Sequence, residues 1–96
     1  MNDDQIIQLY FDRSEQAIKE TDTKYGGYCY SIAYNILSSP EDTEESVSDT
    51  YLAAWNTIPP RKPNFLNAFL GKITRHISID RHIRLTGICR YIRQIK

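Results

Sequence analysis

The side chains with the clearest chemical potential lie between residues 58 and 84. Residues 64–84 repeat apolar side chains at three- and four-residue steps, which predicts an amphipathic helix. Its apolar stripe consists of Leu66, Phe69, Leu70, Ile73 and Ile77. Its opposite side carries Lys72, Arg75, His76 and His82. The preceding residues, 58–63, form a proline-restricted basic loop with the sequence IPPRKP. Basic groups on a rigid loop and an exposed helix face attract phosphates, so this region is typical of a nucleic-acid-facing surface.

The other reactive side chains do not form a pattern typical of an enzyme or a metal site. The sequence has no nucleophile elbow and no phosphate-binding glycine loop, so we expect no catalytic residue and no cofactor. Cys29 and Cys89 are far apart and are not part of a CxxC motif or a histidine cluster, so no metal site is predicted. Asp80 lies four residues before Arg84, and we favour a partly shielded structural pair over an acid–base role with His76. We therefore expect a protein that is not an enzyme.

The distribution of charge indicates two surfaces of opposite sign. Residues 1–58 contain eleven acidic and three basic residues, a net charge of −8. Residues 59–96 contain nine basic residues and one acidic residue, a net charge of +8. The basic half suits phosphates, and the acidic half suits a basic protein surface. A second interpretation is that the two halves neutralise each other within one fold.

A chain of 96 residues is expected to form one domain with one modest core. The first helix is expected over about residues 4–20, followed by a break at residues 21–23. The second helix is expected over about residues 24–37. In its first turn, Gly26 and Gly27 either allow a close helix crossing or fray the helix end.

The third helix has the clearest start signal in the sequence. Ser39 can cap the helix, Pro40 suits its first position, and an acidic first turn follows. The predicted inner stripe consists of Val47, Tyr51, Ala54, Trp55 and Ile58. Two prolines after Ile58 end the helix. With the amphipathic helix described above, the expected fold class is an all-α bundle of about four helices, followed by a short basic tail.

The N-terminal sequence MNDDQIIQ is acidic and unlike a signal peptide, and no apolar run is long enough to span a membrane. Both cysteines are expected to be reduced thiols in or near the core. These features favour a cytoplasmic protein without membrane contact.

Three segments, taken in order, resemble a known family. They read YGGYCYSIAYNIL, SPEDTEESVSDTYLAAWNTI and AFLGKITRHISIDRHIR. Their order and spacing resemble region 2 of bacterial RNA polymerase sigma factors of the sigma-70 family, closest to the extracytoplasmic-function (ECF) class. The resemblance implies a region 2 domain over residues 4–85 and a short basic tail over residues 86–96.

In this family, the third helix of region 2 binds the clamp coiled coil of the polymerase β′ subunit. The following loop and the fourth helix recognise and melt the −10 promoter element, and they capture a flipped base of the non-template strand. The resemblance implies polymerase-binding residues on the third helix: Glu45, Ser48, Asp49, Leu52, Ala53 and Asn56. It implies DNA-binding residues in the loop and the fourth helix: Arg61, Lys62, Asn64, Phe65, Phe69, Lys72, Arg75 and His76.

Family members continue to region 4, a helix-turn-helix that reads the −35 element. No such pattern follows Gly87, so we expect a chain that lacks region 4. The partners implied are core RNA polymerase and the −10 non-template strand of promoter DNA, with an anti-sigma factor as a further candidate. The alternative is a truncated fragment that binds only protein, either core polymerase or an anti-sigma factor, and does not read a promoter.

Overall fold

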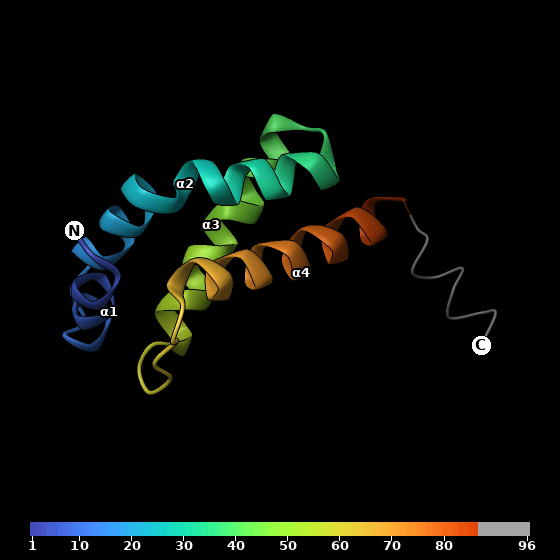
Figure 1. Ribbon diagram of the computed structural model, residues 1–96. Coiled ribbons are helices and arrows are strands. Elements are labelled where there is room, and N and C mark those ends of the chain that lie inside the picture. The colour runs from blue at the N-terminus through green and yellow to red at the C-terminus, as the bar shows by residue number, and fades with distance from the viewer. Residues whose placement is uncertain (87–96) are drawn as a thin grey trace.

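A computed structural model describes residues 1–86 of the chain (Figure 1). This part contains four α-helices and no strand. The helices are α1 (Asp3–Phe11), α2 (Gln16–Leu37), α3 (Pro40–Thr57) and α4 (Leu66–Thr86). In Figure 1, α3 runs back from the end of α2 toward the start of α4, and it packs against both of these helices. The predicted all-α fold class is confirmed, whereas residues 87–96 of the predicted tail lie outside the described residues.

The predicted boundary between the first two helices is wrong. α1 ends at Phe11, α2 begins at Gln16, and the expected break at residues 21–23 lies inside α2. Thr21 is fully buried inside α2. Its burial is tolerated because its hydroxyl donates to the Ala17 carbonyl at 2.8 Å and lies 2.7 Å from the Tyr10 hydroxyl. These bonds satisfy a polar side chain that would otherwise favour a helix end.

The chain reverses instead at Arg13, whose backbone is left-handed with φ of 55°. The short α1 returns against α2 through Asp3, which accepts hydrogen bonds from Lys24 Nζ at 2.8 Å and the Tyr25 hydroxyl at 2.7 Å. A reversal at residues 12–15 is therefore stabilised by contacts between helices that the sequence pattern does not reveal.

The predicted start and inner stripe of α3 are confirmed. Ser39 is its N-cap and accepts a hydrogen bond from the Asp42 amide, with Pro40 as the first helical residue. The stripe residues Val47, Tyr51, Ala54 and Ile58 are buried, and Trp55 is half-buried. α3 ends at Thr57, directly before the extended Ile58, as the following prolines require.

The buried side of α4 differs from the predicted apolar stripe. Leu66 and Leu70 are fully buried as expected, but Phe69, Ile73 and Ile77 are only partly buried. The other buried positions are small residues, namely Gly71, Thr74 and Ser78. Small residues let helices approach closely, so helix contact, rather than side-chain hydrophobicity, decides which face of α4 turns inward.

Two observations show how close this approach is. A Cβ atom added to Gly71 would lie 2.6 Å from Tyr28 Oη, which means that the end of the Tyr28 side chain of α2 lies directly against the backbone of α4. On α3, Thr43, Ser46 and Thr50 are also fully buried, and the Thr50 and Thr74 hydroxyl oxygens lie 3.1 Å apart. A seam of small polar residues therefore lies within the contacts among α2, α3 and α4.

The two adjacent glycines of α2 have different environments. A Cβ at Gly26 would lie 2.7 Å from Asp22 Oδ1 and 3.4 Å from Tyr51 Oη, whereas a Cβ at Gly27 would have no atom within 4 Å. α2 continues unbroken through both residues, so the interpretation of a frayed helix start is wrong. The close-crossing interpretation holds for Gly26 only.

Alanine substitutions at these two glycines should have different effects on stability. Gly27→Ala is expected to raise the free energy of unfolding by about 0.5–1 kcal/mol, because alanine is the better helix former and the methyl group has room there. Gly26→Ala is expected to lose this gain, because its methyl group would displace the Asp22 carboxylate from Tyr51. Urea unfolding followed by circular dichroism measures both values. Equal stabilisation by the two substitutions would contradict the close contact at Gly26.

Candidate functional site

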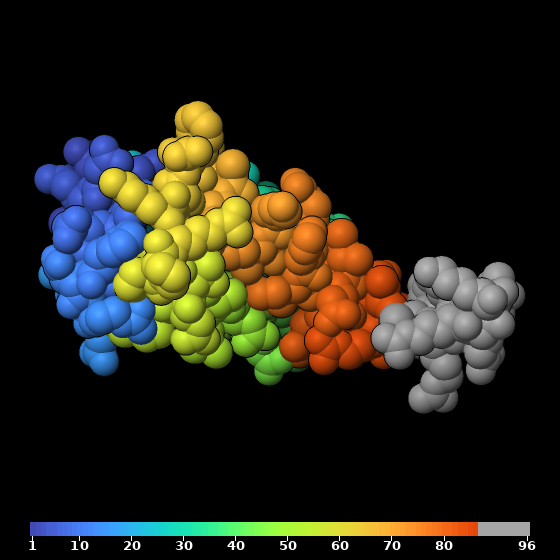
Figure 2. All heavy atoms as spheres, turned by 90° about the horizontal axis from the view of Figure 1, so that it is seen from below, coloured from blue at the N-terminus to red at the C-terminus, as the bar shows by residue number. Residues whose placement is uncertain are grey.

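The predicted basic surface is formed by the loop over residues 58–65 together with the outer side of α4. In Figure 2 the loop, drawn in yellow, projects beside the first turns of α4, drawn in orange. Seven of the eight predicted DNA-binding residues are exposed there: Arg61, Lys62, Asn64, Phe65, Lys72, Arg75 and His76. Phe65 is the most exposed large apolar side chain of the described residues, at 73%. The loop and α4 therefore present cationic groups together with an accessible aromatic ring.

Phe69 differs from the other residues predicted for this surface. Its ring is half-buried and packs against the core, and the Arg61 guanidinium lies 5.6 Å from its centroid. This distance is within the range of a cation–π interaction. Phe69 is thus a support for Arg61 and for the start of α4, and Arg61 is held near the helix by the ring.

Arg13, in the turn between α1 and α2, contacts the start of the loop. Its guanidinium donates to the Trp55 carbonyl at 2.8 Å and to the Ile58 carbonyl at 3.0 Å, and it lies 3.8 Å from the centre of the Trp55 ring. Carbonyls at the end of a helix lack partners within the helix, and a cation there also interacts favourably with the helix dipole. Arg13 therefore fixes the point where α3 becomes the loop.

Sequence reasoning missed this role of Arg13. The only available signal was a basic residue at a helix end within the strongly acidic half of the chain. Its partners lie 42 and 45 residues away, so no local pattern could identify them.

The predicted protein-binding residues occupy the outward side of α3. Five of the six are exposed, namely Glu45, Ser48, Asp49, Leu52 and Asn56, and Ala53 is partly buried. Leu52 is 58% exposed, which is unusual for a leucine in the middle of a helix that packs on a core. These six residues are called the α3 face below. The face combines carboxylates with one prominent apolar side chain, which suits a protein partner with basic groups.

Arg81 of α4 neutralises one edge of the α3 face. Its guanidinium donates to Asp42 Oδ1 through Nε at 3.1 Å and through a terminal nitrogen at 2.8 Å, and it also pairs with Glu45. The hydrogen bond with Asp42 raises the pKa of Arg81, so its charge is permanent. The interpretation that the acidic and basic halves neutralise each other thus holds at this contact.

The predicted pair of Asp80 and Arg84 is present, but its expected shielding is wrong. Their side chains are 57% and 75% exposed, so this ion pair is a surface contact of α4. An exposed pair of this kind contributes little to stability.

Tyr51 and Asp22 connect α3 to α2. The Tyr51 hydroxyl donates to Asp22 Oδ1 at 2.7 Å. Burial and this hydrogen bond raise the pKa of Tyr51, so the hydroxyl remains protonated and continues to donate.

Two further properties concern the described residues only. Cys29 is a buried free thiol, as expected, and burial raises its pKa; Cys89 lies outside the described residues. Within residues 1–86, no group of three or more potential metal ligands comes together, and none of the helices is both long and apolar enough to cross a membrane.

Comparison of the sequence with known protein families identifies the family of this helical domain. Residues 23–87 match the family described as Sigma-70 region 2, which is more than half of the 96-residue chain. The chain therefore belongs to the sigma-70 region 2 family, a domain of transcription initiation factors that acts in RNA polymerase binding and promoter recognition and is not an enzyme family. No curated protein and no solved structure matches the chain significantly. α1 and the first turns of α2 lie before the matched residues.

Removal of the Arg13 side chain should weaken the fold at the loop. Arg13→Ala is expected to lower the free energy of unfolding by about 1–2 kcal/mol, since hydrogen bonds to charged groups contribute roughly this much when partly exposed. It should also shift the fluorescence of Trp55, the only tryptophan of the chain. Urea unfolding monitored by tryptophan emission measures both effects.

Two further variants test the geometry. Lys72→Ala removes an exposed cation of α4 and should leave both signals unchanged. Arg13→Lys should recover less than half of the lost stability, because an ammonium group lacks the planar fork that bonds two carbonyls. Full recovery by lysine would mean that charge alone, rather than the paired hydrogen bonds, matters at this helix end.

Proposed function

We propose that this chain acts as region 2 of an ECF-type sigma factor in the cytoplasm. In this proposal the α3 face binds the clamp coiled coil of the polymerase β′ subunit. The loop over residues 58–65 and the outer side of α4 bind the non-template strand of the −10 promoter element. The observation that carries the proposal is the family match combined with two separate exposed surfaces, one acidic and one basic.

The α3 face has the properties expected of a protein contact. Asp49 and Leu52 are exposed and lie one helical turn apart, so a partner can meet a carboxylate and an apolar side chain together. Charge complementarity speeds and selects association, and the apolar contact adds affinity. A coiled coil with basic residues would supply both types of contact.

The loop and α4 have the properties expected of a single-strand contact. Lys62, Lys72 and Arg75 are exposed and can follow a phosphate backbone, while the exposed Phe65 ring can stack on an unpaired base. Extrusion of a base from a duplex costs a few kcal/mol. A loop that is already fixed by Arg13 adds little ordering entropy to that cost.

A second candidate function is binding to protein alone, either to core polymerase or to an anti-sigma factor. It is favoured by the partners of two basic residues in the second half: Arg81 pairs with Asp42 and Glu45, and Arg84 pairs with Asp80. These contacts reduce the cationic charge that is available to DNA. The two functions differ in their expected salt dependence.

Charge reversal on the α3 face tests polymerase binding. Asp49→Arg is expected to weaken binding to purified core RNA polymerase at least tenfold, because a new cation would repel a basic partner surface. Competition against a full-length housekeeping sigma factor measures the affinity. Glu41→Arg makes the same charge change on the same helix but outside the α3 face, and it should have little effect. Equal affinity of Asp49→Arg and the parent chain, with both folded, would contradict docking through α3.

The salt dependence of DNA binding tests the basic surface. If Lys62, Lys72 and Arg75 each neutralise one phosphate, the affinity for a −10-like single strand should fall with a log–log slope of about −2. Replacement of Lys72 and Arg75 by alanine should reduce this slope to about −0.7, with and without polymerase. Phe65→Ala should cost about 1–3 kcal/mol and leave the slope unchanged. Binding that is independent of salt and sequence would favour the protein-only function.

A further inference from the structure

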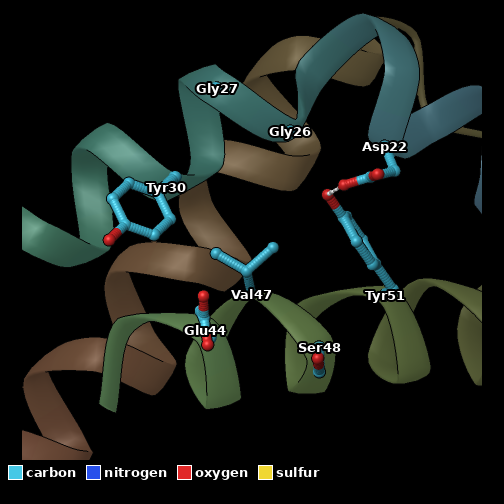
Figure 3. Close-up of a pocket in the computed structure, with 8 residues that line it drawn as sticks. All are labelled: Asp22, Gly26, Gly27, Tyr30, Glu44, Val47, Ser48 and Tyr51. Atoms are coloured by element: carbon cyan, nitrogen blue, oxygen red, sulfur yellow. Dashed lines mark hydrogen bonds between the residues drawn. The ribbon is translucent and has the colours of Figure 1, made fainter. Parts of the chain in front are cut away.

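A shallow pocket with a volume of about 510 Å³ lies between α2 and α3, beside the α3 face. Figure 3 shows how its residues lie: Asp22 and Tyr30 come from α2, and Glu44 and Tyr51 come from α3. Its two charged lining residues, Asp22 and Glu44, are both acidic, and no basic residue lines it. We call it the α2–α3 pocket. Its charge and position make it a candidate for a cationic group.

The two carboxylates of the α2–α3 pocket are available for different reasons. Asp22 is exposed and is positioned by the hydrogen bond from Tyr51 to its Oδ1 atom, which leaves its second oxygen for another donor. Glu44 is exposed on α3, and no other residue of the described chain forms an ion pair with it. Arg81, which neutralises the neighbouring Asp42 and Glu45, does not line this pocket.

Tyr30 and Tyr51 are the aromatic residues that line the pocket, and α2 also contributes two glycines without side chains. Gly26 and Gly27 line it, and the space above Gly27 is open, since a Cβ there would meet no atom within 4 Å. The Tyr30 ring is 36% exposed and is stacked on Tyr34, with a centroid distance of 6.0 Å and an interplanar angle of 10°. This stacking supports a flat aromatic wall, while the missing side chains leave space beside it.

These features together select the chemistry of an occupant. Glu44 and Tyr30 lie at one end of the pocket, and Asp22 lies at the other end beside Tyr51 (Figure 3). A carboxylate and an aromatic ring both attract cations, and a guanidinium suits such a pair better than an ammonium because it is planar, stacks on rings and donates two parallel hydrogen bonds to a carboxylate. A negatively charged or purely apolar group would leave Glu44 without a partner. The best-fitting occupant is therefore an arginine side chain.

We propose that the α2–α3 pocket receives an arginine side chain from the protein that docks on the α3 face. This inference rests on the proposed function, because Ser48 belongs to both the pocket and the α3 face, so a partner on the face can reach the pocket. The pocket extends the contact surface from α3 to α2 and makes Asp22, Tyr30 and Glu44 part of it. None of these residues is in the set implied by the family resemblance.

Glycine amide signals in NMR spectra test the pocket directly. Titration of the full chain with N-acetylarginine amide should shift the Gly26 and Gly27 signals in a saturable way, with a dissociation constant of about 1–10 mM for so small a ligand. Gly71 lies outside the pocket and should not respond. N-acetylcitrulline amide has the same shape without the charge and should cause no saturable shift. Equal responses to both compounds, or none at Gly26 and Gly27, would overturn the proposal.

Binding to core RNA polymerase then separates this proposal from the proposed function. Glu44→Gln should weaken the complex about threefold to tenfold, and it should abolish the response to the arginine compound, because it removes one carboxylate of the pocket. Glu41→Gln makes the same change outside the pocket and should alter neither result. If Asp49→Arg weakens polymerase binding but Glu44→Gln does not, α3 docking stands and the arginine pocket is refuted. If neither substitution matters, both proposals fail.

Discussion

The attachment of Arg13 to the end of α3 connects the acidic half of the chain to the start of the basic surface. The guanidinium binds two carbonyls and the Trp55 ring, and so joins the turn between α1 and α2 to the start of the loop over residues 58–65. The prolines after Ile58 end α3, and Arg13 holds that end where the loop with Arg61, Lys62 and Phe65 begins. Buried Ile58 and Pro63 hold the same segment from the inside. The start of the basic surface is therefore held by a residue from the acidic half of the chain.

The second constraint is the close packing of α4. Gly71, Thr74 and Ser78 allow its backbone to approach its neighbours, and this turns Lys72, Arg75 and His76 outward. The seam has an energetic cost, because the hydroxyls of Thr43, Ser46 and Ser78 are buried without a partner among the described residues. A seam of larger apolar residues would bury more surface but would separate the helices. The close packing that positions the basic face therefore lowers the free energy of unfolding.

The sequence was sufficient to predict the features that have a local cause. The all-α class, the cap at Ser39, the stop before the prolines and the inner stripe of α3 follow from spacing and from capping chemistry, and the structure confirms them. The exposed positions of Lys72, Arg75 and His76 also follow from helical periodicity. Such predictions succeed because the residues that decide them lie within one or two turns of each other.

The errors have a common origin in contacts between distant residues. Thr21 looked like a helix break, but its bonds to Ala17 and Tyr10 hold it inside α2. The apolar pattern of α4 pointed to Ile73 and Ile77, but close packing chose Gly71 and Thr74. The pairing of Arg81 with Asp42 and Glu45 spans more than 35 residues and was equally invisible. Local periodicity therefore predicts that a helix forms, but not which of its residues the neighbouring helices select.

The bridge made by Arg81 gives the domain a competition that neither surface has by itself. Glu45 belongs to the α3 face, yet its carboxylate is already engaged by a guanidinium from the second half of α4. A cation from a partner that binds Glu45 must share or displace Arg81, and displacement loosens the tie between α4 and α3 at that level. Arg81 therefore makes one carboxylate of the α3 face part of the contact between α3 and α4.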